Sequence, residues 1–292
     1  MRFIDKSANH TLYNAAKKLY NKEDTIRIRR RIDYVSEKTA GCGEVVERVA
    51  QAVSYSEGIS FVGTYQASIH LIDTGDGLVM IDTGYLNTFY WVVNGINSLG
   101  YRPSDVKYIF MTHWHGDHVE GVKPMLTLAP EAKTVIGVRD DKRVFERYGI
   151  KPDIVVKDGD TLTCGDITFR FVETPGHTVG TVSIFFDYPE DGRTYHVGMF
   201  GGAGRGALFE DNVDYYKGSR NDYFNSLARL KAEKVDLFLG NHCWNNNTDE
   251  KAAAMKANPE INPFVDEKEF YRFLDYCYTD VKERMKREGL TE

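Results

Sequence analysis

The segment His113-Trp114-His115-Gly116-Asp117-His118 carries three histidines and one aspartate within six residues. It follows KYIFMT, residues 107–112, a hydrophobic stretch that predicts a buried strand, and a helix is expected to begin around Gly116. Alternating side chains of an extended segment project to the same side, so His113 and His115 are placed to bind one metal ion. Asp117 and His118 are then placed to bind a neighbouring ion.

Four donors cannot complete two metal sites, because each zinc ion takes about four ligands. Two further histidines are candidates. His177 lies in the turn TPGHT, residues 174–178, between two predicted strands, and His242 follows the predicted strand VDLFLG, residues 235–240. Three protein ligands for each ion leave room for water, whereas a structural zinc has a closed set of four. The pattern therefore favours a catalytic metal site.

The composition is that of an ordinary globular protein, with 42% hydrophobic and 27% charged residues in a chain of 292. The chain has 37 Lys and Arg residues against 43 Asp and Glu, and a net charge of −6 makes nucleic acid a poor default partner. No stretch approaches the length of a membrane span, and the opening residues lack the apolar core of a signal peptide. We therefore expect a cytoplasmic protein without membrane contact. Reduced thiols are expected, because no CxxC spacing occurs among Cys42, Cys164, Cys243 and Cys277.

The chain divides into two segments that differ in composition and hydrophobic pattern. Residues 1–57 are polar and are interpreted as an N-terminal helical extension, with a short helical pattern at Val45, Val46, Val49 and Val53. The arginines at positions 27 and 29–31 could bind an anion or a partner, but a solvated helix face is favoured. Residues 58–292 form the second domain, and the extension or the C-terminal helix offers a contact for a homodimer.

The hydrophobic pattern of the second domain predicts two halves, each with strands first and helices after them. One helix should begin after Asn87 and Thr88 and end at Gly100, another should run from about Asn221 to Ala232, and the last should begin with a capping box of Asp266 and Glu269. This order predicts an α/β fold in which two sheets pack face to face with helices outside. The expected strands are 59–63, 67–73, 77–82, 107–112, 134–138, 154–156, 167–173, 181–186, 195–200 and 235–240, and the last helix buries Phe270, Phe273, Leu274, Cys277 and Val281.

The segments HWHGDH, PGHTVGTVS (175–183) and GLVMIDTG (77–84), together with His242, resemble the metallo-β-lactamase superfamily. The resemblance covers roughly residues 57–260 and implies a four-layer αβ/βα sandwich. It is closest to the β-lactamase subclass whose second zinc is held by Asp-His-His. It implies two zinc ions, the first held by His113, His115 and His177 and the second by Asp117, His118 and His242. Asp82, in the IDTG turn, would orient ligands.

The chain departs from the family pattern at residues 196–204, which read HVGMFGGAG. Hydrolytic relatives such as glyoxalase II place a metal-bridging aspartate there, and this stretch has no carboxylate. The Asp-His-His β-lactamases have substrate-binding serines in this region, and these are absent too. The resemblance therefore leaves the substrate open.

The function predicted from these features is zinc-dependent hydrolysis. A hydroxide shared by the two ions would attack the carbonyl of a small lactam, lactone, amide or ester, and Asp117, the catalytic residue, would orient it and carry its proton. Two dications, one carboxylate and one hydroxide sum to a charge of about +2, so an anionic small-molecule substrate is expected. The alternatives are a lactonase or thioesterase of the same superfamily, oxygen chemistry with iron, and a non-catalytic metal-binding or partner-binding protein. Iron or manganese are the alternatives to zinc.

Several single residues have a structural and a functional interpretation. His10 is expected at the surface, His70 and Cys243 in structural roles, and His196 away from the metals. The glycine-rich run 198–206 lacks the order of a phosphate loop and is expected to approach the metals closely. Six aromatic residues are equally placed to wall a substrate pocket or to pack in the core: Tyr65, Trp114, Phe209, Tyr215, Tyr216 and Trp244.

Overall fold

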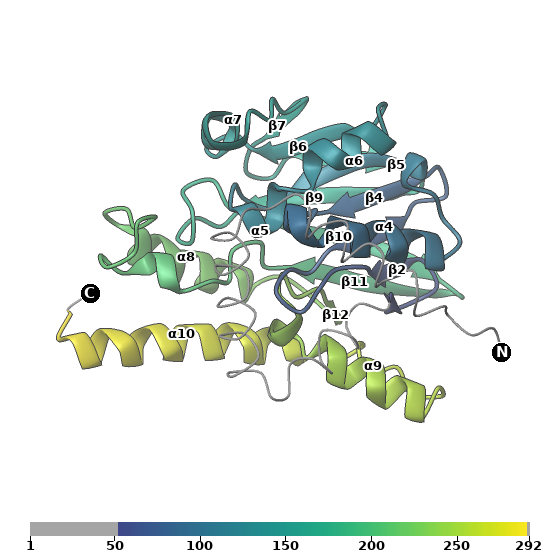
Figure 1. Ribbon diagram of the computed structural model, residues 1–292. Coiled ribbons are helices and arrows are strands. Elements are labelled where there is room, and N and C mark those ends of the chain that lie inside the picture. The colour runs from purple at the N-terminus through teal and green to yellow at the C-terminus, as the bar shows by residue number, and fades with distance from the viewer. Residues whose placement is uncertain (1–51, 291–292) are drawn as a thin grey trace, which may run out of the picture. The chain divides into compact units, whose positions relative to one another are not determined.

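The computed structural model describes residues 52–290, in which two β-sheets are each covered by helices (Figure 1). The first sheet has seven strands in the order of the chain. Neighbouring strands from β1 to β4 are antiparallel, and those from β4 to β7 are parallel. The strands are β1 (Val53–Ser54), β2 (Ile59–Phe61), β3 (His70–Asp73), β4 (Leu78–Ile81), β5 (Val106–Met111), β6 (Lys133–Gly137) and β7 (Ile154–Val156).

The second sheet has five strands in the order β12-β11-β10-β9-β8. Its strands from β8 to β11 form an antiparallel meander, and β12 joins the edge parallel to β11. The strands are β8 (Thr161–Cys164), β9 (Ile167–Glu173), β10 (Val182–Glu190), β11 (Arg193–Met199) and β12 (Leu237–Phe238).

Alternation of side chains along the strands gives each sheet an inner and an outer face. On the inner side, the ring of Phe110 in β5 lies 5.1 Å from the rings of both Phe169 and Phe171 in β9. On the outer side of the first sheet, Ile109 packs with residues of α4 (Phe89–Ser98) and α6 (Val122–Leu128). The outer side of the second sheet packs against α8 (Ser219–Leu230) and α10 (Glu269–Glu288). This arrangement confirms the predicted αβ/βα sandwich.

The remaining helices are short and lie mostly at the ends of strands. α5 (Gly116–Val119) follows β5 directly, and α7 (Asp141–Tyr148) follows β6. The others are η1 (Leu86–Thr88), η2 (Pro103–Asp105), η3 (Gly206–Leu208), η4 (Cys243–Asn245) and α9 (Thr248–Ala257). None of the helices in residues 52–290 is both long enough and apolar enough to cross a membrane.

The carboxyl ends of several strands meet at one edge of the sandwich. β4, β5 and β6 are parallel and are followed by Asp82, His113 and Asp140. In the second sheet β9, β11 and β12 all point the same way, because β10 is antiparallel to its two neighbours. Loops after these strands carry His177, the glycine-rich run and His242. The fold therefore gathers residues from six strand ends at one place.

Most predicted elements are present with boundaries within a few residues, and some details differ. The predicted helix at Gly116 is two short helices separated by Glu120 and Gly121, and α9, β8 and β1 were not predicted. Val53, expected in the helical pattern of the extension, lies in β1, where it pairs with Phe61 of β2. The capping box at Asp266 and Glu269 is wrong, because the Glu269 carboxylate pairs with Lys251 instead of closing the helix end. Cys277 is buried in the core, as expected. Most of the predicted extension, with its arginines, His10 and Cys42, lies outside the described residues.

Candidate metal centre

The HWHGDH segment leaves β5 as an extended corner and enters α5. His113 is fully buried two residues after the strand, and His115 caps the N-terminus of α5 with extended backbone angles. Asp117 and His118 lie in the first turn of that helix. The corner therefore presents the two halves of the motif toward different neighbours.

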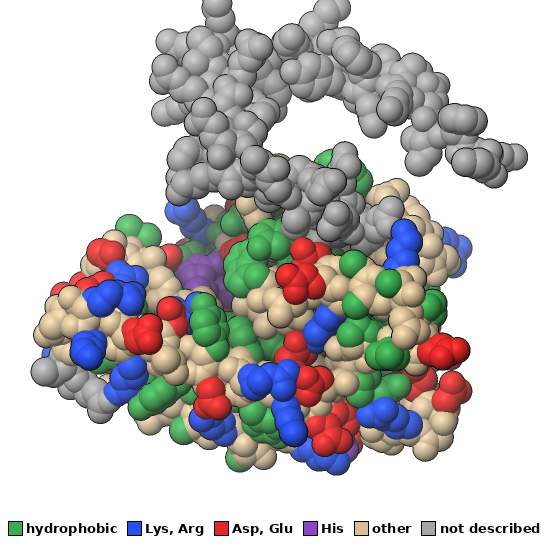
Figure 2. All heavy atoms as spheres, turned by 90° about the horizontal axis from the view of Figure 1, so that it is seen from below, with side chains coloured by type: hydrophobic (Ala, Val, Ile, Leu, Met, Phe, Trp, Pro, Cys, Tyr) green, Lys and Arg blue, Asp and Glu red, His purple; other side chains and the backbone are tan. Residues whose placement is uncertain are grey.

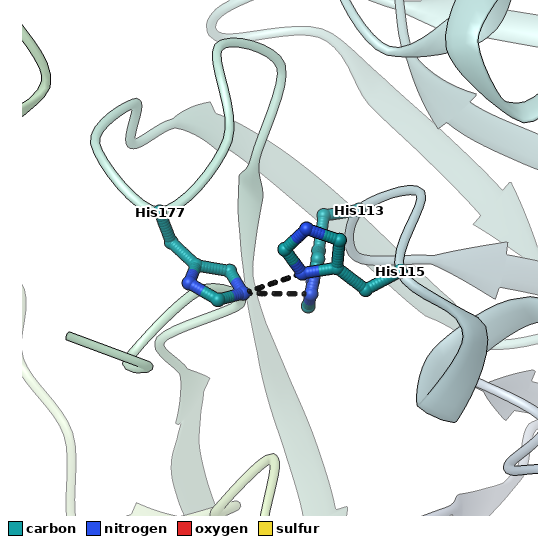
Figure 3. Close-up of side chains that lie close together, drawn as sticks. All are labelled: His113, His115 and His177. Atoms are coloured by element: carbon teal, nitrogen blue, oxygen red, sulfur yellow. Dashed lines mark hydrogen bonds between the residues drawn. The ribbon is translucent and has the colours of Figure 1, made fainter. Parts of the chain in front are cut away.

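The first group of donors consists of His113, His115 and His177 (Figure 3). Nε2 of His177 lies 3.1 Å from Nε2 of His113 and 2.9 Å from Nδ1 of His115. The three nitrogens converge on one point although His177 comes from the loop after β9 (Figure 3).

Hydrogen bonds on the far side of each ring fix which nitrogen faces this point. Nδ1 of His177 donates to the carbonyl oxygen of Gly204 at 2.8 Å, which leaves a lone pair on Nε2. The hydroxyl of Thr112 donates to Asp82, so it accepts from Nδ1 of His113 at 3.0 Å. For His115 the carboxylate of Asp214, 3.4 Å from Nε2, favours a proton on that nitrogen. Three lone pairs that face one another need a cation between them, so this donor set fits a metal ion.

The second group consists of Asp117, His118 and His242, with all donor atoms within 4.8 Å of one another. Nε2 of His118 lies 3.2 Å from Oδ2 of Asp117, and Nε2 of His242 lies 4.0 Å from the same oxygen. Nδ1 of His242 donates to the carbonyl oxygen of Gln66 at 2.7 Å, so Nε2 faces inward. Nε2 of His118 is buried and, beside its ion-pair contact with Asp117, makes no well-aligned hydrogen bond among the described residues, which is expected of a nitrogen that binds a metal.

The carboxylate of Asp82 connects the two donor groups through hydrogen bonds. It is fully buried and adopts a left-handed φ of 60°, a conformation that aspartate tolerates better than most residues. Oδ2 accepts from Nδ1 of His118 at 2.7 Å, and Oδ1 accepts from the backbone N–H of Thr112 at 2.8 Å. The Thr112 hydroxyl then connects the same carboxylate to His113. Asp82 thus contacts His118 directly and His113 through Thr112, one histidine of each group.

The charge states suit metal binding. Burial lowers the pKa values of His113 and His177 well below the ordinary range and that of His242 to about 4, so these imidazoles are neutral at pH 7. Burial also lowers the pKa of His118, but the carboxylates of Asp117 and Asp82 outweigh it and raise the pKa to about 10. Burial raises the pKa of Asp117, yet His118 and His242 bring it below its usual value. A cation entering this group would release the proton of His118.

The glycine-rich run lies against His177, as expected. A side chain at Gly204 would place its Cβ 2.7 Å from Cε1 of His177, and one at Gly202 would approach Cβ of His177 to 2.9 Å. Glycine is required there because the loop backbone packs on the imidazole. In place of a carboxylate, this loop contributes the Gly204 carbonyl oxygen that fixes the histidine.

Asp140 is a buried carboxylate beside the centre that the sequence interpretation missed. Its buried carboxylate accepts hydrogen bonds from the backbone N–H of Trp114 at 3.3 Å, the Thr178 hydroxyl at 2.7 Å and the backbone N–H of Gly180 at 2.9 Å. It therefore ties the HWHGDH corner to the loop that carries His177. The available signal was its position just after a parallel strand, equivalent to that of Asp82 after β4.

Four other residues with open interpretations lie outside both groups. His70 is buried and donates from Nε2 to the Gly240 carbonyl oxygen, and His196 bonds to Asp187. Cys243 is buried beside Asp249, and Phe209 packs in the core under α10. Their structural roles agree with the expectations for His70, His196 and Cys243.

Two neighbouring cavities of about 360 and 530 Å³ open beside the first group. The larger is lined by His115 and Trp114, and the smaller by Trp114, Tyr215 and Tyr216. Histidine side chains are visible in a hollow on one face of the molecule (Figure 2). On the other side of the centre the ring of Trp244 stacks on His242 at 4.5 Å, and Tyr65 lies beside that tryptophan. Five of the six aromatic residues are thus near the centre.

A family model described as the metallo-beta-lactamase superfamily matches residues 62–242, which include both donor groups. The chain belongs to this superfamily. The family match and the two groups, His-His-His and Asp-His-His, confirm the resemblance stated from the motifs.

Solved structures agree with this membership. A subclass B3 metallo-beta-lactamase of Bradyrhizobium japonicum, BJP-1, superposes with a TM-score of 0.75 at 26% identity, covering 82% of this chain and 95% of the other. The FEZ-1 metallo-beta-lactamase of Legionella gormanii has the same TM-score at 22% identity, covering 82% and 97%, and shows the common fold.

Curated relatives by sequence have other names. A hydroxyacylglutathione hydrolase of Francisella tularensis subsp. novicida is 32% identical over 145 residues, 48% of this chain and 51% of the relative. A beta-lactamase-like protein 2 homolog of Caenorhabditis elegans is 28% identical over 193 residues, 64% of this chain and 60% of the relative. The chain thus spans about half the length of the first of these relatives.

Proposed function

We propose that this protein is a zinc-dependent hydrolase of small carbonyl compounds. His113, His115 and His177 would hold one zinc ion, and Asp117, His118 and His242 the other. The observation that carries the proposal is the convergence of imidazole nitrogens whose outer hydrogen bonds leave the inner nitrogens free for a cation. A centre built only for folding would close each ion with four protein ligands, whereas each group here supplies three.

The zinc ions, when bound, supply polarisation of a carbonyl oxygen and activation of water near neutral pH. The chain's own residues position these groups. Oδ2 of Asp117 faces both His118 and His242 and is partly exposed, so it can orient the attacking water and accept its proton. Asp82 holds His118 in place through Nδ1. Asp140 fixes the distance between the His113 corner and the His177 loop.

The proposed substrates are lactams, lactones, amides and esters, including thioesters, that carry a negative charge. Two families of relatives support different members of this set, because B3 metallo-beta-lactamases match by structure and hydroxyacylglutathione hydrolases match by sequence. A lactonase or thioesterase is therefore the alternative within the same superfamily. A non-catalytic metal-binding or partner-binding role is the alternative from a different class.

Turnover by the purified, zinc-loaded protein tests the proposal. A chromogenic cephalosporin, a lactone, a thioester and an aryl ester are offered side by side, with His115→Ala as the metal-site control. We expect at least one substrate to be hydrolysed by the native protein and not by the variant. Metal content measured by mass spectrometry must show two zinc ions per chain. Full zinc occupancy with no turnover of any of these classes would contradict the hydrolase proposal and favour the non-catalytic role.

A cytoplasmic location and a homodimer are further parts of this proposal. Cys164, Cys243 and Cys277 are free thiols, which fits a reducing compartment. Fractionation of cells and light scattering of the purified protein test the two statements.

A further inference from the structure

The two cavities beside the first donor group form one surface, which we call the α7 pocket. They share Trp114, Arg143, Glu146, Val213 and Asp214 as lining residues, and the larger one reaches His115 and Gly116. Residues of the helix α7 and of the segment 213–216 line this pocket. A molecule that lies with its carbonyl at the candidate metals can therefore extend its other end along α7.

The α7 pocket is positively charged in a chain whose net charge is −6. Its basic lining residues are Arg139, Lys142, Arg143 and Arg147, against two acids, Glu146 and Asp214. Both acids have partners, because Glu146 pairs with Lys142 at 3.6 Å and Asp214 faces His115. Arg139 lies 3.9 Å from Glu173. Among the described residues, neither Arg143 nor Arg147 makes an ion pair, so their charges are available to a ligand.

Arg143 is held in a defined place by an aromatic ring. Its guanidinium carbon lies 5.5 Å from the centre of the Trp114 ring, and that ring lies 4.5 Å from the ring of His115. The guanidinium carbon of Arg143 therefore lies within about 10 Å of the centre of the His115 ring. Stacking on the face of an aromatic ring leaves the N–H groups at the edge of the guanidinium free to donate. Such a fork matches the two oxygens of a carboxylate or phosphate.

Tyr215 also lines this pocket. The hydroxyl of Tyr215 makes no hydrogen bond to any other residue in the described range, although its ring lies under Arg220. The nearby Tyr216 hydroxyl is already used, because it donates to Asp222. The free tyrosine hydroxyl and the unpaired arginine are the combination expected where an oxyanion is bound at a partly exposed site.

We propose that Arg143, assisted by Arg147 and Tyr215, binds an oxyanion group at the end of the substrate remote from the reacting carbonyl. This inference rests on the proposed function, in which the carbonyl lies at the candidate metals. It narrows the substrate class to acyl compounds whose acyl part ends in a carboxylate or phosphate, separated from the carbonyl by a short chain. The anion is recognised by α7, apart from the charge of the metals themselves.

Paired esters test the proposal in the zinc-loaded protein. The acyl chain of 4-nitrophenyl glutarate ends in a carboxylate, that of 4-nitrophenyl valerate is its neutral counterpart, and 4-nitrophenyl 4-phosphonobutyrate represents a phosphate-like end. A charge-assisted hydrogen bond at this exposure corresponds to a factor of about 10 in kcat/KM. We expect Arg143→Ala to lower kcat/KM for an anionic ester by about that factor and to leave the neutral ester unchanged. Which anionic ester is affected more distinguishes a carboxylate from a phosphate.

The matched control is Arg193→Ala, because Arg193 also stacks on an aromatic ring, at 4.7 Å from Tyr195, but lies on β11 away from the pocket. This variant should keep the ratio of the anionic to the neutral ester. Arg143→Lys should retain part of the preference, since it keeps the charge and loses the fork. If Arg143→Ala leaves the ratio of kcat/KM between the anionic and the neutral ester unchanged, whether or not both values fall, the proposal is overturned.

A binding measurement separates failure of this inference from failure of the hydrolase proposal. Calorimetry compares N-phenylglutaramate with neutral N-phenylpentanamide, two amides that resist hydrolysis. If neither ester is turned over but the glutaramate binds about 10-fold more tightly and Arg143→Ala removes the difference, the oxyanion site stands and the hydrolase proposal fails. If esters are hydrolysed without any preference for a negative charge, the hydrolase proposal stands and the oxyanion site is refuted.

Discussion

Replacement of Asp82 by asparagine is expected to weaken metal binding at the Asp117, His118 and His242 group. The carboxylate accepts from three donors: Oδ1 accepts from the backbone N–H of Thr112, Oδ2 accepts from His118 Nδ1, and the single Thr112 hydroxyl lies within reach of both oxygens. Asparagine has one acceptor oxygen, so its NH₂ group must face one of these donors. The N–H of Thr112 cannot become an acceptor, whereas an imidazole can. The amide therefore turns its NH₂ toward His118.

Nδ1 of His118 then accepts from this amide and loses its proton, so the remaining proton stays on Nε2, the nitrogen that faces Asp117. That change removes the lone pair that a metal needs. Loss of such an orienting partner typically reduces metal affinity by about 10- to 100-fold, or about 1.4 to 2.7 kcal/mol. Stability of the metal-free protein should fall as well, by about 1 to 3 kcal/mol if one buried donor is left unpaired. The first group should keep most of its affinity, because Thr112 still contacts His113.

Zinc titration in competition with a chromophoric chelator measures both affinities, and urea unfolding after chelation measures the stability. The matched control is Asp236→Asn, which alters another buried carboxylate that accepts a backbone N–H, from His196, far from either group. That variant should bind zinc normally. If Asp82→Asn binds two zinc ions with native affinities, the tautomer argument is refuted.

Three further outcomes are expected. Gly204→Ala should weaken metal binding by the first group, because the new Cβ would lie 2.7 Å from the His177 ring. Gly206→Ala is the control and should bind zinc normally, because its Cβ would have its nearest neighbour at 3.5 Å. Competition with a chelator measures the zinc affinity of both variants. Burial raises the pKa of Asp140 to about 6, so the unfolded chain releases this proton at lower pH than the folded protein. The free energy of unfolding of the metal-free protein, measured relative to that of Asp140→Asn, should therefore fall as pH rises from about 4 to about 6. The same pH dependence in both proteins would contradict this prediction. His242→Ala should reduce zinc to one ion per chain and remove most activity with an unchanged circular dichroism spectrum, and full activity would refute the two-metal assignment.

The fold was largely predictable because its strands and helices have strong local signals. The Ile109 and Met111 side of β5, the stripe of α10 that includes Cys277, and the start of α4 at Phe89 follow directly from hydrophobic periodicity. The elements that were missed have weak signals. α9 has nearly all of its side chains at least partly exposed, so it shows no apolar stripe, and β8 has only four residues, of which two are apolar, too few for a clear alternation.

The sequence by itself determined which residues can form the candidate metal centre. The H-x-H-x-D-H spacing is local, so the geometry of one strand end and one helical turn is enough to place four donors, and the family pattern indicated His177, His242 and Asp82. Only the tertiary structure decided how those donors are oriented. Nδ1 of His242 bonds to the carbonyl of Gln66, 176 residues away, and the His177 ring is fixed by Gly204 of a different loop. Arg143 faces the pocket because β6 places α7 beside the end of β5. Contacts between residues so distant in sequence have no local signal, because they depend on how the two sheets bring their strand ends to one edge.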